Sequence, residues 1–199
     1  FFIREKDKGA YDDYLASRLL EVFYRDGMGL ADKAAVAIQL LSHLAENIFR
    51  KPDAALVERY CAVVDDLVEY ISDEPDIVYH LIRNTRFDWS LHQHNLNVGI
   101  IATALAVNYL DIDSNQHNIA ELGEAFFLHD IGRVSVPGAV QNKRGLFLKY
   151  DWEYMKRHPQ AGLNILAEMK YYSREAEIVL LQHHERQDGS GYPKGLYGD

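Results

Sequence analysis

Apolar residues recur at helical spacing along most of the chain, and we find no run of alternating strands. Three helical stripes precede residue 75, separated by two glycines near residue 28 and by the Lys51-Pro52-Asp53 triplet. The apolar positions of these stripes are Leu15, Leu19, Val22 and Phe23; Ala37, Leu40, Leu41, Leu44 and Ile48; and Leu56, Tyr60, Val63, Leu67 and Ile71. The triplet favours a helix start, because proline is tolerated in a first helical turn and aspartate caps one.

The next helices each carry a histidine in an apolar stripe. A short helix over about 76–84 leads to a turn around 86–89, and a helix over 90–110 follows. Its stripe consists of His94, Val98, Ile101 and Leu105, which predicts that His94 points inward. A further helix, opening near residues 113–114, aligns Leu122, Phe126 and His129, so His129 is also predicted to face the core.

The remaining third of the chain combines short helices with loops. A Gly- and Pro-containing loop is predicted from Gly132 to about Lys149, and helices resume through Trp152 and past His158. Another helix places His183 on one face with Ala176, Val179 and Leu180, and the glycine-rich stretch 188–199 has no helical period. The pattern as a whole predicts an all-α bundle.

Histidines on the apolar faces of several helices favour a metal centre. A single histidine of this kind is more often a core residue satisfied by a hydrogen bond. Burying several imidazoles in one core is costly unless something satisfies them, and a metal ion does so by taking their ring lone pairs.

Composition and charge narrow the function. The chain has 199 residues, 48% of them hydrophobic and 26% charged, with one cysteine, nine histidines and a net charge of −9. The negative charge argues against binding of a nucleic-acid polymer. The longest mainly apolar run, 99–107, is too short to cross a membrane. The single Cys61 excludes an intrachain disulfide, so we expect a reducing, cytoplasmic location.

One adjacent pair, His129 and Asp130, places an imidazole and a carboxylate at the same point of the chain. A carboxylate can bridge two cations while histidines complete the coordination, and such a mixed nitrogen and oxygen set suits Fe, Mn or Zn. The candidate metal ligands are His94, His129, Asp130, His158, His183 and His184.

Three segments together resemble a known family. They are FFLHDIGRVSVP, MKRHPQAG and HHERQDGSGYPKGL, and the likeness runs from about Trp89 to Asp199. The chain resembles the HD-GYP domain, a branch of the HD superfamily of metal-dependent phosphohydrolases. The resemblance implies a helical bundle that hydrolyses cyclic di-GMP to pGpG and often onward to GMP. It divides the chain into an accessory helical segment, 1–75, which could dimerise or connect to a sensor, and the HD-GYP domain, 76–199.

The resemblance also assigns roles. His129 and Asp130 correspond to the HD pair, with Asp130 as bridging ligand, and the other histidines of the set complete the site. Gly191, Tyr192 and Pro193 form the GYP loop, which in the family lies near the active site and is a candidate contact for partners such as GGDEF diguanylate cyclases. Two cations lower the pKa of a bridging water and offset charge on the phosphodiester. Trp152 is interpreted as a core or groove aromatic.

The chain departs from the family pattern at three points. The last metal aspartate of the family lies downstream of GYP, and the chain stops at Asp199 before it, so we expect a fragment of a longer protein. Ser90 stands where trinuclear members have glutamate, which predicts two metals, Fe or Mn, with Zn as a further option. Arg133 replaces the usual lysine after the HD pair, and its fork could hold the substrate phosphate.

Two alternatives to cyclic di-GMP hydrolysis remain open from the sequence. One is a signalling module of this family that binds nucleotide or partner proteins with little turnover. The other is an HD hydrolase of a different nucleotide, such as another cyclic dinucleotide.

Overall fold

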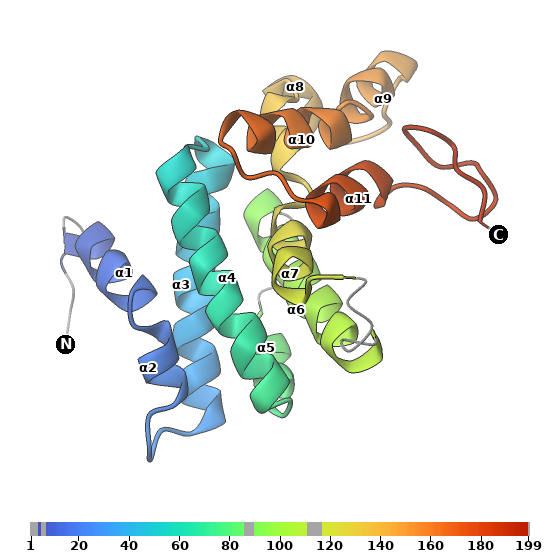
Figure 1. Ribbon diagram of the computed structural model, residues 1–199. Coiled ribbons are helices and arrows are strands. Elements are labelled where there is room, and N and C mark those ends of the chain that lie inside the picture. Colours follow the sequence, from blue (N-terminus) through green and yellow to red (C-terminus); the bar gives the residue numbers. More distant parts are fainter. Residues whose placement is uncertain (1–3, 5–6, 86–89, 111–116, 199) are drawn as a thin grey trace. The chain divides into compact units, whose positions relative to one another are not determined.

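The computed structural model describes residues 4, 7–85, 90–110 and 117–198, and the regular elements among them are helices, apart from one isolated bridge between Asp188 and Tyr197. The chain forms two compact units, Phe1–Phe127 and Leu128–Asp199 (Figure 1). The predicted all-α class is confirmed. The boundary predicted near residue 75 separates the accessory segment from the HD-GYP domain. These compact units do not test it, so it stays a prediction.

The first unit is built on two long helices, α3 and α4, whose buried faces match the predicted stripes. Asp53 begins α4 as expected, because its carboxylate accepts a hydrogen bond from the Leu56 amide at 3.0 Å. The predicted first helix is instead two, interrupted where the Ser17 hydroxyl donates to the Tyr14 carbonyl at 2.9 Å. The helices are α1 (Lys8–Ala16), α2 (Leu19–Phe23), α3 (Leu30–Arg50), α4 (Ala54–Asp73), α5 (Ile77–Asn84), α6 (Leu91–Tyr109) and α7 (Ile119–Leu128).

Helix α6 turns a different face to the core from the predicted one. Ile101 and Leu105 are 48% and 53% exposed, whereas Leu96 and Ile100 are fully buried. His94 lies on α6 and is exposed, so the prediction that it points into this core is wrong. The physical reason is that α6 is apolar around most of its circumference, and periodicity then gives no unique buried side.

The described part of α7 begins next to a side-chain cap. The predicted opening near residues 113–114 lies outside the described residues. In the described part α7 begins at Ile119, where the Asn118 side chain accepts a hydrogen bond from the Ala120 amide at 3.1 Å.

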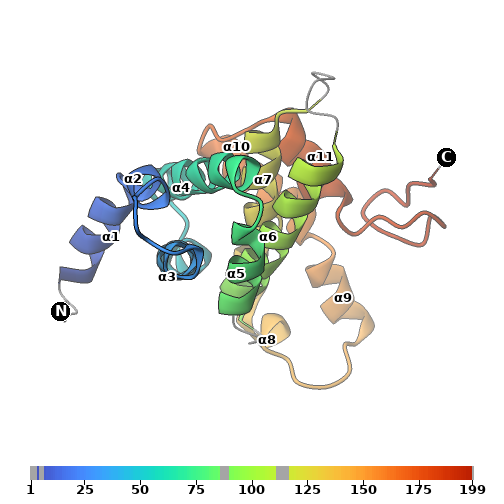
Figure 2. The same cartoon turned by 90° about the horizontal axis from the view of Figure 1, so that it is seen from below.

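The second unit consists of short helices followed by a non-helical C-terminal stretch (Figures 1 and 2). The predicted loop after Gly132 contains two of them, which corrects that expectation. Val136 and Val140 bury a small apolar cluster with Met155, and this burial stabilises helical turns despite the nearby glycine and proline. The elements are the 3-10 helix η3 (Ile131–Ser135), α8 (Gly138–Gln141), α9 (Lys149–Met155), α10 (His158–Glu168) and α11 (Arg174–Gln182).

The backbones of η3 and α10 approach each other closely at two glycines. A Cβ atom on Gly132 would lie 1.9 Å from the His158 carbonyl oxygen and 2.4 Å from the Gly162 nitrogen. Only glycine permits this contact, which fixes the start of α10 against the turn that carries Asp130.

In the part of the chain that the structure describes, no helix combines the length and the apolarity that a membrane span requires.

Candidate metal centre

The predicted ligands of the second unit lie at the ends of its helices. His129 and Asp130 stand between α7 and η3, His158 is the first residue of α10, and His183 and His184 follow α11 directly. Chain direction changes at these points, so side chains distant in sequence converge. His129, Asp130 and His158 are 5%, 3% and 1% exposed, and the predicted burial of His129 is confirmed.

The nitrogen and oxygen atoms of this cluster meet at one point. The Asp130 Oδ1 lies 3.0 Å from His158 Nε2 and 3.7 Å from His183 Nε2, and these two nitrogens are 3.1 Å apart. His129 Nε2 lies 3.9 Å from the other carboxylate oxygen, Oδ2. One ligand atom each from Asp130, His158, His183 and His184 falls within 4.8 Å of the others, a spacing suited to a shared metal ion.

Backbone carbonyls set the tautomers of two of these histidines. His158 Nδ1 donates to the Met155 carbonyl at 2.7 Å, and His183 Nδ1 donates to the Leu180 carbonyl at 2.9 Å. Each proton therefore sits on Nδ1, and each Nε2 carries its lone pair toward the other. Two lone pairs at this distance repel unless a proton or a metal cation lies between them, and histidine ligands are held by such backbone hydrogen bonds in protein metal sites. The donor set therefore fits a metal ion.

The charges around the centre keep its ligands in the state that binds metal. Burial raises the pKa of the Asp130 carboxyl, but the neighbouring rings of His158 and His183, followed by His129 and Arg133, outweigh it, so the pKa lies well below its ordinary value. Burial, followed by the nearby rings of His183 and His158, lowers the pKa of His184 to about 4. At neutral pH the carboxylate is ionised and the His184 imidazole is neutral.

Arg133 is held against the bridging carboxylate. Its Nη1 donates to Asp130 Oδ2 at 3.0 Å, and its side chain is 25% exposed. The residue is therefore not a freely solvated loop cation. It orients Asp130 from the side opposite to the histidines that face Oδ1.

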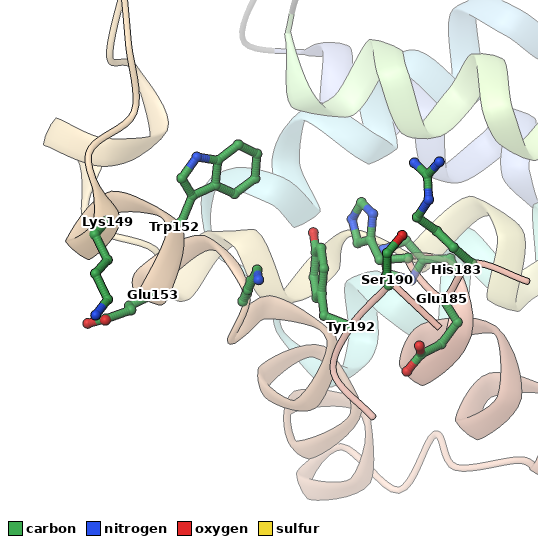
Figure 3. A pocket seen from close by; sticks show the side chains of 11 residues that line it. Lys149, Trp152, Glu153, His183, Glu185, Ser190 and Tyr192 are labelled. Carbon is green, nitrogen blue, oxygen red and sulfur yellow. The ribbon is translucent and has the colours of Figure 1, made fainter. Parts of the chain in front are cut away.

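A pocket of about 850 Å³ opens beside His183 and His184 (Figure 3). This volume lies within the range of small-molecule sites. Helix α9 and the C-terminal loop supply its other walls, and Tyr192 stacks on the His184 ring with centroids 4.5 Å apart. The lining residues are Lys149, Trp152, Glu153, Lys156, His183, His184, Glu185, Arg186, Ser190, Gly191 and Tyr192.

Glu185 holds the loop that carries Gly191, Tyr192 and Pro193. Its carboxylate accepts hydrogen bonds from the amides of Lys194, Gly195 and Leu196 at 2.6, 3.2 and 2.9 Å. A Cβ atom on Gly191 would lie 2.5 Å from the Arg186 nitrogen, so the loop packs directly on the chain that follows the two histidines. Tyr192 is thereby fixed as a wall of the pocket.

Comparison with known proteins now identifies the family. The family model of the HD domain matches residues 68–199. The chain belongs to the HD domain family. Proteins of this family depend on metal, in agreement with the His and Asp cluster of the second unit.

Individual relatives of the HD domain agree with the resemblance seen in the sequence. The chain is 33% identical to a cyclic di-GMP phosphodiesterase of Pseudomonas aeruginosa over 67% of its length and 32% of the relative. It is 38% identical to the 3'3'-cGAMP-specific phosphodiesterase 2 of Vibrio cholerae over 36% of its length and 14% of the relative. It thus spans a third or less of these two proteins.

A solved structure shares the fold of the chain. It is described as a HDG"Y"P protein from Bdellovibrio bacteriovorus, with a TM-score of 0.73 and 20% identity, and the match covers 98% of this chain and 63% of the other.

The structure brings some of the predicted site residues together and leaves the role of others as a prediction. Five predicted ligands, His129, Asp130, His158, His183 and His184, come together in the second unit. His94 lies in the first unit, so its part in the ligand set stays a prediction. Arg133 contacts the carboxylate and does not line the pocket, so its predicted contact with substrate phosphate also stays a prediction.

Sequence reasoning did not place two features of the HD domain at the site. Glu185 stood in the HHE string, and its position next to two predicted ligands was the available signal. Lys149, Trp152 and Lys156 have the spacing i, i+3, i+7, which indicates one helical face, but only the fold shows that this face lines the pocket.

Proposed function

We propose that the chain is the catalytic HD-GYP part of a phosphodiesterase that hydrolyses cyclic di-GMP to pGpG and onward to GMP. The convergence of His158 and His183 on the Asp130 carboxylate, beside a pocket walled by the GYP loop, carries the proposal. The named activities of the relatives support it.

The metal site takes two divalent ions in this proposal, Fe or Mn, with Zn as a third option. Bound ions would lower the pKa of a coordinated water and offset negative charge on the phosphodiester oxygens. The residues that would hold them are His94, His129, Asp130, His158, His183 and His184.

The side chains of the HD domain prepare the site for an anionic substrate. Asp130 stays ionised because of its histidine and arginine neighbours. Arg133 fixes the orientation of that carboxylate through its 3.0 Å hydrogen bond and adds positive charge beside it. The Glu185 carboxylate accepts hydrogen bonds from three backbone amides of the loop, and these donors reduce its repulsion of a phosphate group. Tyr192 closes the pocket next to His184.

A second candidate substrate is 3'3'-cGAMP, because a Vibrio cholerae relative specific for that dinucleotide is 38% identical over 73 residues. Binding of partner proteins such as GGDEF cyclases at the GYP loop, a homodimer and a cytoplasmic location remain predictions.

Anaerobic turnover of the two dinucleotides tests the proposed function. The metal-loaded protein is incubated with cyclic di-GMP or with 3'3'-cGAMP, and chromatography follows the products. We expect linear dinucleotide from cyclic di-GMP at the higher kcat/KM, and its loss after chelation. Faster cleavage of 3'3'-cGAMP would show that this dinucleotide is the preferred substrate. If the protein binds metal but cleaves neither dinucleotide, the result would favour a signalling module with little turnover.

A further inference from the structure

One face of α9 lines the pocket opposite the metal cluster. Lys149, Trp152 and Lys156 are spaced three and four residues apart, so they lie on the same side of the helix. All three line the pocket, whose other walls include His183, His184 and Tyr192 (Figure 3). A ligand bound at the histidines would therefore extend toward α9.

The Trp152 indole is supported on one edge and open elsewhere. Phe147 contacts it with ring centroids 5.3 Å apart, and Phe147 itself packs on the cluster of Val136, Val140 and Met155. Trp152 is nevertheless 47% exposed. A large aromatic ring that is braced from behind and exposed in a pocket offers a stacking surface for a planar group, so Trp152 is a groove aromatic rather than a core one.

Lys156 adds a cation next to this aromatic surface. Its Nζ lies 5.3 Å from the centre of the Tyr192 ring. Within the part of the chain that the structure describes, no ion pair joins Lys156 to a carboxylate. Glu185, another residue of the lining, is engaged by the loop amides. The ammonium group is therefore available to an anionic ligand.

We propose that Trp152 and Lys156 form a subsite for the nucleotide of the cyclic substrate that is not being cleaved. Trp152 stacks on its purine base, and Lys156 pairs with its phosphate while the other phosphate lies at the His and Asp cluster. This inference rests on the proposed function, because only a dinucleotide presents a second base and a second phosphate. It identifies α9 as the element that separates dinucleotides from smaller phosphodiesters.

Equilibrium binding to the full, metal-loaded chain tests the stacking surface. We expect Trp152→Ala to raise the Kd for cyclic di-GMP about tenfold, measured by titration calorimetry, since base stacking on aromatic side chains contributes strongly to nucleotide binding. Trp152→Phe should restore most of the affinity. Tyr154→Ala is the matched control, because Tyr154 lies on the same helix with 42% exposure but does not line the pocket.

A small substrate separates this subsite from the catalytic centre. Bis(4-nitrophenyl) phosphate has one phosphate and no purine, so we expect Trp152→Ala to raise KM for cyclic di-GMP about tenfold and to change KM for this small diester much less. Lys156→Gln should weaken cyclic di-GMP binding and reduce its dependence on salt, whereas Arg157→Gln, next to it but outside the lining, should do neither.

The outcomes distinguish the inference from the proposed function. If the wild type binds cyclic di-GMP without cleaving it, the proposed activity fails, and the Kd comparison still decides the subsite. If Trp152→Ala and Tyr154→Ala bind equally well, the subsite is refuted while hydrolysis stands. If the wild type neither binds nor cleaves a cyclic dinucleotide, both are overturned.

Discussion

Replacing Gly132 by alanine tests whether backbone packing sets the position of a metal ligand. The added Cβ would lie 1.9 Å from the His158 carbonyl oxygen and 2.4 Å from the Gly162 nitrogen. Both are backbone atoms, so no side-chain rotation relieves the contact. Reaching even 3.0 Å requires η3 and the start of α10 to separate by about 1.1 Å.

A displacement of this size exceeds what a metal site tolerates. Ligand distances in such sites hold to within about 0.2 Å, and disturbing the support of a ligand typically costs 10- to 100-fold in metal affinity. Forcing an extra methyl group into a packed region costs about 1–3 kcal/mol of unfolding free energy. We therefore expect Gly132→Ala to lose both metal affinity and stability by these amounts.

The assay measures metal per chain after dialysis at fixed free metal, together with the urea unfolding midpoint. Gly138→Ala is the matched control, because its added Cβ would meet nothing closer than 3.8 Å, at the Asn142 side chain. The reasoning is refuted if Gly132→Ala retains the metal content and the unfolding midpoint of Gly138→Ala.

Three further results are expected. Glu185→Gln should speed proteolytic cleavage within 188–198, read by mass spectrometry, because a neutral amide holds the three loop amides more weakly; equal rates in wild type and variant would count against this role. Burial, followed by the charge of Asp65, raises the pKa of Glu124 from 4.5 to about 7, so the native state loses stability as pH rises from about 4.5 through about 7. Glu124→Gln should then be more stable than wild type by roughly 1–2 kcal/mol at pH 8, after allowing for partial exposure, and no more stable at pH 4; an equal difference in urea unfolding at both pH values would contradict this. Chelation should lower the melting temperature and added Mn²⁺ should restore it, because the ligands converge only in the folded chain; an unchanged melting temperature would speak against the site.

The helices that the sequence predicted well are those with one apolar side. In α3 and α4 the stripes through Leu44 and Leu67 are buried as expected, because polar residues occupy the other sides. Helix α6 is apolar on several sides, so burial is decided by tertiary packing, and Leu105 proved exposed. The helical turns after Gly132 are stabilised by the small cluster that includes Val136 and Val140, and no local sequence pattern predicted this cluster.

The metal ligands could be predicted from short sequence motifs. The other features of the site depend on contacts between segments that are distant in the sequence. His129 and Asp130 are adjacent, and the histidines after them stand in recognisable strings. The contact of Gly132 with α10 and the placement of Trp152 on the pocket wall arise only once the short helices pack. Such contacts leave no periodic signal in a single sequence.

The central claim is that Asp130 holds the metal ions on which hydrolysis depends. Its most direct test is one parallel measurement of metal per chain and of products from cyclic di-GMP, in wild type and in Asp130→Ala, with circular dichroism to confirm that both are folded. We expect about two metal ions and formation of pGpG or GMP in the wild type, and loss of both in the variant. Sustained hydrolysis by a folded Asp130→Ala protein would contradict the account.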